Sequence, residues 1–305
     1  MTDADKTGRS VALRDPIPWA DLVEIVRTAE QTGYRSLFLP EVGARETPSA
    51  LAGLATVTER IELATGVVSL ASREVHTVAM LAATLQELSG GRFILGVGAG
   101  NELGIEEVRA AVSTIAALLA GEEKGGRALG LLADPVPDIW LAALGPRMTE
   151  LAGEVADGVL LNWCDPARVE RAREEIRRGA ERSDRDPSAV TVAVYVRACV
   201  GVDEGMALEA LGRAASMYAA MPYYRRQLDL AGLGSESEAA ASGSGERLAR
   251  ALCAWGTRAE AEARLEAYRD AGADVVVVYP VAVRDVASSL FGTVLGLSPS
   301  PSLEP

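Results

Sequence analysis

Short apolar runs alternate with longer amphipathic stretches along most of the chain. Eight of these runs have the length and the β-branched or aromatic content that are typical of strands. Most of them, such as Val275–Tyr279, are apolar at every position, as expected for parallel strands covered on both faces. In chain order, the predicted strands are Ser10–Leu13, Ser36–Leu39, Glu62–Val68, Arg92–Val97, Asp138–Ala142, Gly158–Leu161, Thr191–Val200 and Asp274–Tyr279.

The segments between the predicted strands carry apolar residues at helical spacing. Trp19–Gln31 has one apolar face and is followed by Gly33, a common stop signal. Thr257–Ala271 shows the same pattern, and the spacing of Thr257 and Glu260 predicts a capping box at its start. Strands that alternate with helices in this way are typical of a parallel sheet with helical connections.

Eight strands with intervening helices predict an α/β protein with a (β/α)8 TIM barrel, formed as a single domain over residues 1–305. A doubly wound open sheet is the alternative fold, but no GxGxxG motif opens the first predicted helix. Two segments depart from the regular pattern. The low-complexity sequence of Gly234–Gly245 predicts a mobile surface loop, and the linker-like segment Gly121–Asp134 carries a predicted short hairpin at Ala128–Leu132.

The composition is that of a globular chain with an acidic surface. The 305 residues include 30 basic and 43 acidic side chains, a formal charge of −13, and 49% of the residues are hydrophobic. This balance argues against a nucleic-acid partner, because phosphate binding requires clustered Lys and Arg. No apolar run approaches the ~20 residues of a membrane helix, and the first ten residues lack the apolar core of a signal peptide. We therefore expect a cytoplasmic location and no membrane partner.

Cysteine and histidine usage predicts no metal site. Cys164, Cys199 and Cys253 have no CxxC spacing, and His76 is the single histidine. These counts exclude a disulfide framework, a cysteine zinc site and a multi-histidine metal site. His76 lies just inside a helical pattern, where a structural or solvated role is favoured over a catalytic one.

In a (β/α)8 barrel, functional residues lie at the carboxyl ends of the strands. This rule alone selects Arg14, Glu41, Gly66–Ser69, Gly98–Glu102, Ala143–Arg147, Asn162–Trp163, Arg197 and Tyr279–Pro280. Glu41 follows an apolar strand, where a carboxylate could meet a ligand or lie in a solvated loop. Tyr223 and Tyr224, with Met221, could line a pocket, although aromatic residues at helical spacing also fit a core.

Two strand ends are rich in glycine. The segment Gly91–Glu102 carries Gly96, Gly98 and Gly100, and glycine lets a backbone approach a flat ligand closely. The alternative interpretation is a tight barrel corner. Gly66, at the end of the third predicted strand, indicates a bulge, an unusual peptide bond or a plain strand glycine.

A third strand end is suited to an anion. Gly145 and Pro146 directly follow a strand and open a predicted helix, and proline fits the first helical turn. Free amide groups and the helix dipole at such a start favour a phosphate, and Arg147 adds a positive charge. An ordinary strand-to-helix turn is the alternative.

Several stretches together resemble the bacterial-luciferase-like superfamily, in its branch of coenzyme F420-dependent oxidoreductases. The resemblance covers most of the chain in order, so it is specific for the family but not for a substrate. The matching stretches are AEQTGYRSLFLPE (Ala29–Glu41), TERIELATGVVS (Thr58–Ser69), LQELSGGRFILGVGAG (Leu85–Gly100), PDIWLAALGPRMTELAGEVADGVLLNW (Pro137–Trp163) and WGTRAEAEARLEAYRDAGADVVVVYP (Trp255–Pro280).

The resemblance implies a barrel that binds a flavin-type ring at its carboxyl-terminal mouth and exchanges a hydride at C5 of the deazaflavin. In many family members a non-proline cis peptide supports the ring, and the matching bond is Gly66–Val67. The resemblance places Glu41 near the ring. It places the ring edge beside Gly98, Ala99, Gly100 and Asn101, and the coenzyme phosphate at Ala143, Leu144, Gly145, Pro146 and Arg147.

The sequence departs from the family pattern at two positions that serve proton transfer. An Asp-His pair is replaced by Glu41-Val42, and a glutamate after the GxG is replaced by Asn101, with Glu102 adjacent. Alcohol oxidation needs a base at such a position. We therefore expect reduction of a C=C or C=N bond, with a proton from Glu41, Glu102 or water. The segment 101–136 is also shorter than is usual in the family.

The charge of the coenzyme restricts this interpretation. A deazaflavin carries phosphate and a polyglutamate tail, which a net charge of −13 would repel unless Arg147, Arg45 or Arg73 compensates. An FMN-dependent monooxygenase of the same superfamily and a non-catalytic coenzyme-binding barrel are the alternatives. A small organic molecule is the expected substrate, and a homodimer is possible because family members are often dimers.

Overall fold

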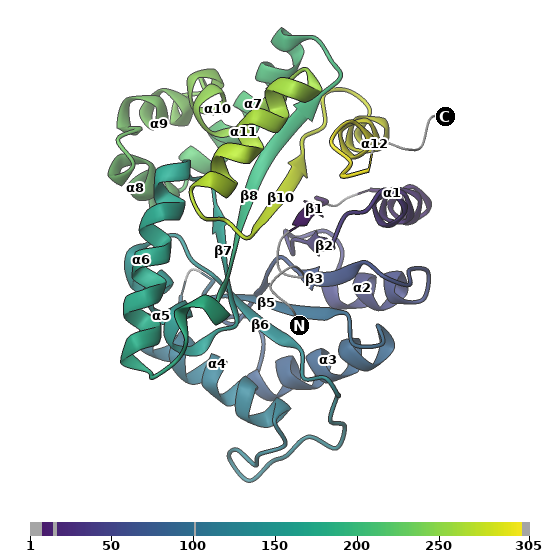
Figure 1. The fold of residues 1–305 in the computed structure, drawn as a ribbon, viewed down its shortest axis with the longest axis vertical. Helices are drawn as coiled ribbons and strands as arrows, with labels where there is room; N and C mark the ends of the chain where they lie inside the picture. The colour runs from purple at the N-terminus through teal and green to yellow at the C-terminus, as the bar shows by residue number, and fades with distance from the viewer. Residues whose placement is uncertain (1–7, 15–16, 101, 301–305) are drawn as a thin grey trace.

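The computed structural model describes residues 8–14, 17–100 and 102–300, and eight of its strands close into a parallel barrel (Figure 1). The ring closes because β10 pairs with β1 on one side and with β8 on the other. The TIM-barrel prediction is confirmed, and the open sheet is wrong. The barrel strands are β1 (Gly8–Ala12), β2 (Ser36–Leu39), β3 (Glu62–Thr65), β5 (Phe93–Gly98), β6 (Asp138–Ala142), β7 (Gly158–Asn162), β8 (Thr191–Val200) and β10 (Val275–Pro280).

Helices surround the barrel, and two short strands extend the sheet. β4 (Val68–Ser69) continues β3 along β5, and β9 (Ala254–Gly256) pairs with the end of β8 outside the ring. The helices are α1 (Trp19–Gln31), α2 (Thr47–Ala55), α3 (Val75–Leu88), α4 (Ile105–Leu119), α5 (Pro146–Val155), α6 (Pro166–Arg182), α7 (Glu204–Ala219), α8 (Pro222–Leu230), α9 (Gly234–Ala241), α10 (Glu246–Leu252), α11 (Arg258–Asp270) and α12 (Val286–Gly296). No helix within the described ranges has the length and apolar character needed to cross a membrane.

The structure confirms both predicted helices and corrects two irregular segments. α1 has the predicted bounds, and the Thr257–Glu260 capping box opens α11. The loop predicted at Gly234–Gly245 is wrong for Gly234–Ala241, which forms helix α9, and the mobility of the segment stays a prediction. Its alanine and glutamate residues are strong helix formers, and its buried Ser237 and Ala240 face the neighbouring helices.

The segment between α4 and β6 contains less regular structure than the sequence predicts. Its pairing among the described residues is an isolated bridge between Lys124 and Arg127. The hairpin predicted at Ala128–Leu132 is therefore wrong. Leu132 instead packs beside Gly121, and Pro135 accepts a hydrogen bond from Gln86, so the segment contacts the carboxyl-terminal ends of α4 and α3.

Large side chains fill the middle of the barrel. Phe38 lies at the centre, with its ring centroid 5.7 Å from those of both Trp140 and Tyr195. Because side chains alternate along a strand, the next inward positions lie one layer closer to the carboxyl ends. That layer contains Gly66, Gly98, Ala142, Asn162, Arg197 and Tyr279, and it forms the mouth of the barrel.

Candidate functional site

A β-bulge interrupts the rim of the barrel between β3 and β5. Ala64 pairs with Ile94, and pairing resumes where Val68 meets Val97. The first strand therefore has one more residue than its partner in this interval. The Gly66–Val67 bond within the bulge is cis, as the resemblance implied.

Thr65 and the neighbouring glycines hold this bulge in place. The Thr65 hydroxyl donates to the Gly96 carbonyl at 2.7 Å and accepts from the Gly96 amide at 2.8 Å, replacing the missing ladder bonds. A Cβ on Gly96 would lie 1.9 Å from the Thr65 carbonyl, and one on Gly98 would lie 2.9 Å from Val67. The tight-corner interpretation therefore explains these glycines. Their contact with a coenzyme stays a prediction.

The opposite wall of the barrel also touches the bulge. A Cβ on Gly66 would lie 2.3 Å from the hydroxyl of Tyr195, which crosses the interior from β8. Along the rim, Ala99 is half-buried and Gly100 has a φ of 66°, a conformation that favours glycine. Asn101, a predicted contact of the ring edge, lies outside the described residues.

The predicted anion site lies on the strand next to the bulge-bearing pair. β6 is hydrogen-bonded to β5, so the loop after β6 shares the same rim. α5 begins at Pro146 as predicted, and no side chain caps its first amides. Arg147 is exposed and has no ion pair among the described residues. Ala143, Leu144 and Gly145 therefore lead into a helix start that offers free amides beside a cation.

Helix α6 fixes the position of this helix start. Arg168 donates to the Leu144 carbonyl at 3.3 Å and pairs with Glu175 at 2.9 Å. The two helices also touch through their backbones. A Cβ on Gly153 would lie 2.3 Å from the Ile176 carbonyl, and one on Gly179 would lie 1.9 Å from the Glu150 carbonyl.

Glu41 lies at the mouth, in an ion pair with Arg73. Arg73 donates to both carboxylate oxygens of Glu41, one of them at 2.7 Å, and also to Glu46 at 2.7 Å. The hydrogen bond to Glu41 is the main reason that the pKa of Arg73 is raised. Glu102 is exposed and has no partner among the described residues. The structure therefore leaves the two predicted catalytic carboxylates in different environments, one engaged and one free.

Two of the three arginines expected to compensate the coenzyme charge are engaged elsewhere. Arg73 is held by its two glutamates, and Arg45 donates to the Ile17 carbonyl at 2.6 Å. Arg147 alone of the three has a guanidinium without a partner among the described residues.

A buried arginine stands on the other side of the mouth. The guanidinium of Arg197 lies 4.1 Å from the ring centre of Tyr279, 4.7 Å from that of Trp163 and 5.0 Å from that of Tyr218. It donates to the side-chain carbonyl of Asn162. The strand-end rule selected Arg197, Asn162 and Tyr279 but gave them no role. Tyr218 was missed, because nothing in the sequence shows that its helix turns back over the mouth.

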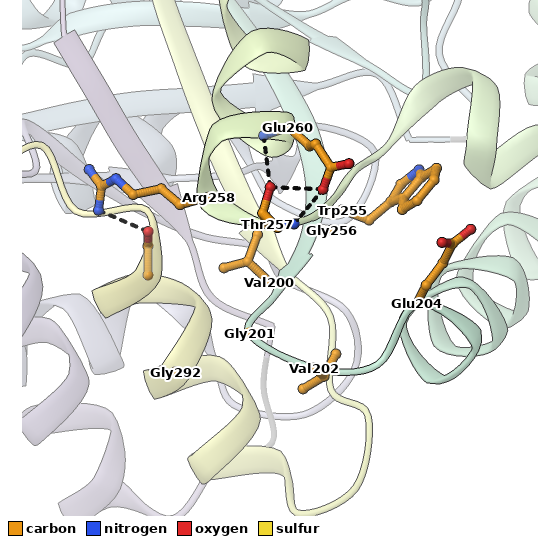
Figure 2. Close-up of a pocket in the computed structure, with 11 residues that line it drawn as sticks. Val200, Gly201, Val202, Glu204, Trp255, Gly256, Thr257, Arg258, Glu260 and Gly292 are labelled. Atoms are coloured by element: carbon orange, nitrogen blue, oxygen red, sulfur yellow. Dashed lines mark hydrogen bonds between the residues drawn. The ribbon is translucent and has the colours of Figure 1, made fainter.

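A separate cavity of about 420 Å³ lies away from these residues (Figure 2). It is bounded by Val200–Val202, by the start of α11 and by Gly292 of α12. The Thr257–Glu260 capping box already satisfies the helix start at its edge, as Figure 2 shows. None of the predicted site residues lines this cavity. Within the described ranges, no cluster of His, Cys, Asp and Glu could hold a metal ion.

Comparisons with known proteins agree with this fold. The family model described as luciferase-like monooxygenase matches residues 3–116 and 122–275. A 5,10-methylenetetrahydromethanopterin reductase from Methanolobus tindarius is 35% identical over 211 residues, which cover 62% of this chain and 64% of the relative. The chain therefore spans less than two thirds of the length of that relative.

Two solved structures have the same barrel. The coenzyme F420-dependent tetrahydromethanopterin reductase from Methanopyrus kandleri has a TM-score of 0.82 at 21% identity, covering 96% of this chain and 98% of that chain. An F420-dependent secondary alcohol dehydrogenase, solved with an F420-acetone adduct, has a TM-score of 0.79 at 16% identity, covering 95% and 99%. At these identities, the likeness shows the fold alone.

Proposed function

The chain belongs to the luciferase-like monooxygenase family, and on that premise we propose that it is a coenzyme F420-dependent oxidoreductase. It transfers a hydride between C5 of the deazaflavin and a small organic substrate, in the direction of C=C or C=N reduction. The relatives whose names state reduction or F420 dependence support this proposal.

One observation in the structure carries the proposal. The bulge at Gly66–Val67 and the uncapped start of α5 lie on the same sector of the rim, because β6 is bonded to β5. A flat ring with a tethered phosphate needs a backbone floor and an anion site on one rim. The described residues therefore fit a coenzyme of this shape.

The proposed roles follow from these positions. Val67 and the Gly98–Gly100 corner support and flank the ring, while the α5 amides and Arg147 bind the phosphate. The bound reduced coenzyme would supply a hydride from C5. Because Arg73 engages both oxygens of Glu41, we assign that carboxylate to positioning at the mouth. Glu102 or water then delivers the proton to the substrate.

Coenzyme titration tests the proposal. We expect the full-length chain to bind oxidised F420 more tightly than FMN or a nicotinamide coenzyme, measured by equilibrium dialysis. Arg147→Gln should weaken F420 binding about two- to fivefold, the size expected for one exposed charge. Arg60→Gln, at the amino-terminal end of β3, is the matched control and should change nothing.

The same titration separates the alternatives. Tight FMN binding without F420 binding, together with oxygen consumption, would identify an FMN-dependent monooxygenase and overturn the proposal. Tight F420 binding with no hydride exchange across a panel of unsaturated substrates would identify a non-catalytic barrel. The cytoplasmic location and the homodimer stay predictions, which cell fractionation and light scattering test.

A further inference from the structure

Arg197 is the most buried arginine among the described residues that has no carboxylate partner. Arg197 is 4% exposed, compared with 8% for Arg9 and 6% for Arg168. Arg9 pairs with Glu262, and Arg168 pairs with Glu175. A buried charge without a counter-ion reduces the free energy of unfolding, which indicates a functional role for Arg197.

The groups around Arg197 supply no negative charge. Burial raises the pKa of Tyr279 to about 12 and that of Cys253 to about 12. Burial likewise raises the pKa of Tyr224 and of Tyr195 above the usual range for phenols. All of these neighbours are therefore neutral near pH 7, and the guanidinium keeps an uncompensated positive charge.

The hydrogen bonds of the cluster leave donors available. Arg197 uses Nη1 to donate to Asn162, and the Asn162 amide donates in turn to the Tyr224 hydroxyl at 2.7 Å. The latter bond fixes the orientation of the Asn162 amide, so its carbonyl faces the guanidinium. No other acceptor among the described residues receives a hydrogen bond from Arg197, which leaves Nε and Nη2 for a ligand.

The free donors of Arg197 lie opposite the bulge of the proposed coenzyme site. β8 and β3 are four strands apart in either direction around the ring, so they face each other across the barrel. Tyr195 reaches across and touches Gly66 of the bulge. Arg197, on the same face of β8, is two residues nearer the mouth, or about 6–7 Å along the strand. It therefore stands opposite the floor proposed for the coenzyme ring.

We infer that Arg197 and Asn162 form a binding site for the carboxylate of a planar, unsaturated substrate. The inference rests on the proposed function, because it assigns the substrate side of that same mouth. The guanidinium matches a carboxylate in geometry and charge, and the rings of Trp163, Tyr218 and Tyr279 that surround it give the site apolar walls. Tyr218 is half-buried and is the most exposed of these rings, so it forms the outer side of the site.

A pair of ligands that differ only in charge tests the site. Isothermal titration calorimetry of the full chain with cinnamate and with neutral cinnamamide measures the contribution of the carboxylate. We expect wild type to prefer cinnamate by about tenfold or more, as a charge-assisted hydrogen bond contributes. Arg197→Met should remove that preference, and Arg197→Lys, which keeps the charge without the planar fork, should retain part of it.

Arg264→Met is the matched control. Arg264 also stacks on an aromatic ring, 4.5 Å from the centre of Trp255, but it lies on α11 away from the mouth. This variant should keep the full preference for cinnamate. Equal binding of the two ligands by wild type would overturn the inference, and that comparison needs no variant to fold. An undiminished preference in Arg197→Met would overturn it too.

F420 titration of the same proteins separates this inference from the proposed function. Arg197→Met should bind F420 as wild type does, because Arg197 lies across the barrel from the bulge and two strands away from β6, whose loop carries the proposed phosphate site. Loss of F420 binding in this variant would assign Arg197 to the coenzyme and overturn the inference. A wild-type chain that prefers cinnamate but does not bind F420 would support the carboxylate site while the proposed function fails.

Discussion

Two three-strand parts of the barrel rim, called its small-residue half and its polar half below, are built from opposite kinds of side chain. On β3, β5 and β6 the inward residues at the carboxyl ends are Gly66, Gly98 and Ala142, and on β7, β8 and β10 they are Asn162, Arg197 and Tyr279. The first half presents backbone and small side chains, whereas the second presents hydrogen-bonding and aromatic groups. The difference indicates that one half provides a shape and the other provides chemical recognition.

Adding one carbon to the small-residue half should have the largest effect. Gly96→Ala would place a Cβ 1.9 Å from the Thr65 carbonyl, a backbone atom that cannot move without breaking the bulge. We expect a loss of about 3 kcal/mol or more in the free energy of unfolding, at the upper end for overpacking. Urea denaturation measures this loss.

Gly130→Ala is the control for that substitution. Nothing lies within 4 Å of a Cβ at Gly130, so we expect a change within about 0.5 kcal/mol, as for most surface substitutions. If Gly96→Ala is as stable as Gly130→Ala, the small-residue half does not depend on close backbone packing, and the comparison between the two halves fails.

A double variant tests the contact that joins the two halves across the barrel, between Gly66 and the Tyr195 hydroxyl. Gly66→Ala brings a Cβ to 2.3 Å from the Tyr195 hydroxyl, and we expect a loss of about 1–3 kcal/mol in stability. Tyr195→Phe removes that oxygen, which has no hydrogen-bond partner, so alone it should be nearly neutral. Combined with Gly66→Ala, it should recover most of the loss. Additive effects of the two substitutions in a double-mutant cycle would contradict this contact.

Alkaline pH should lower the stability of the chain through the polar half, and this is the smallest of the three expected effects. Burial raises the pKa of Tyr279 from 10.0 to about 12, so the unfolded chain releases a proton that the folded chain keeps between these values. The free energy of unfolding therefore falls as pH rises above 10, by up to about 1.4 kcal/mol per pH unit for this one residue. Tyr279→Phe keeps the ring beside Arg197 and should reduce the loss at pH 11 by about 1 kcal/mol.

Urea denaturation at pH 9, 10 and 11 measures this slope. Tyr223→Phe is the matched control, because Tyr223 is 45% exposed and should leave the slope as in wild type. A Tyr279→Phe slope equal to that of wild type would mean that Tyr279 ionises freely in the folded chain, and the polar half would not be sealed from solvent.

The regular parts of the fold could be predicted because their signals are local. Apolar runs such as Val275–Tyr279 became strands almost residue for residue, and the Thr257–Glu260 cap opened the predicted helix. The segment 234–245 was predicted wrongly, because its low complexity hid the helix propensity of its alanines and the packing of α9 (Gly234–Ala241) against α7 and α8. Low complexity describes composition, and composition alone does not report a packing partner.

The candidate site likewise has parts that could be predicted from the sequence and parts that could not. The helix start after Gly145 follows from glycine and proline chemistry at a strand end, which a sequence displays directly, whereas the cis bond at Gly66–Val67 was implied by the family resemblance. The engagement of Arg73 by Glu41 could not be foreseen, since 32 positions separate the two residues. Nor could the environment of Arg197, because its neutral neighbours come from β7, β10 and α7, which only the folded chain brings together.

The backbone contact between α5 and α6 has a consequence for selectivity. Because Gly153 and Gly179 leave no gap between these helices, a side chain at either position would push α5 away from α6 and shift Pro146 relative to the bulge. On the proposed function, the distance from the bulge to Pro146 sets the length of tether that the site accepts between the ring and the phosphate. Redesigning the chain for a coenzyme with a shorter tether would thus require a change in how α5 packs against α6, rather than a change of one side chain at the mouth.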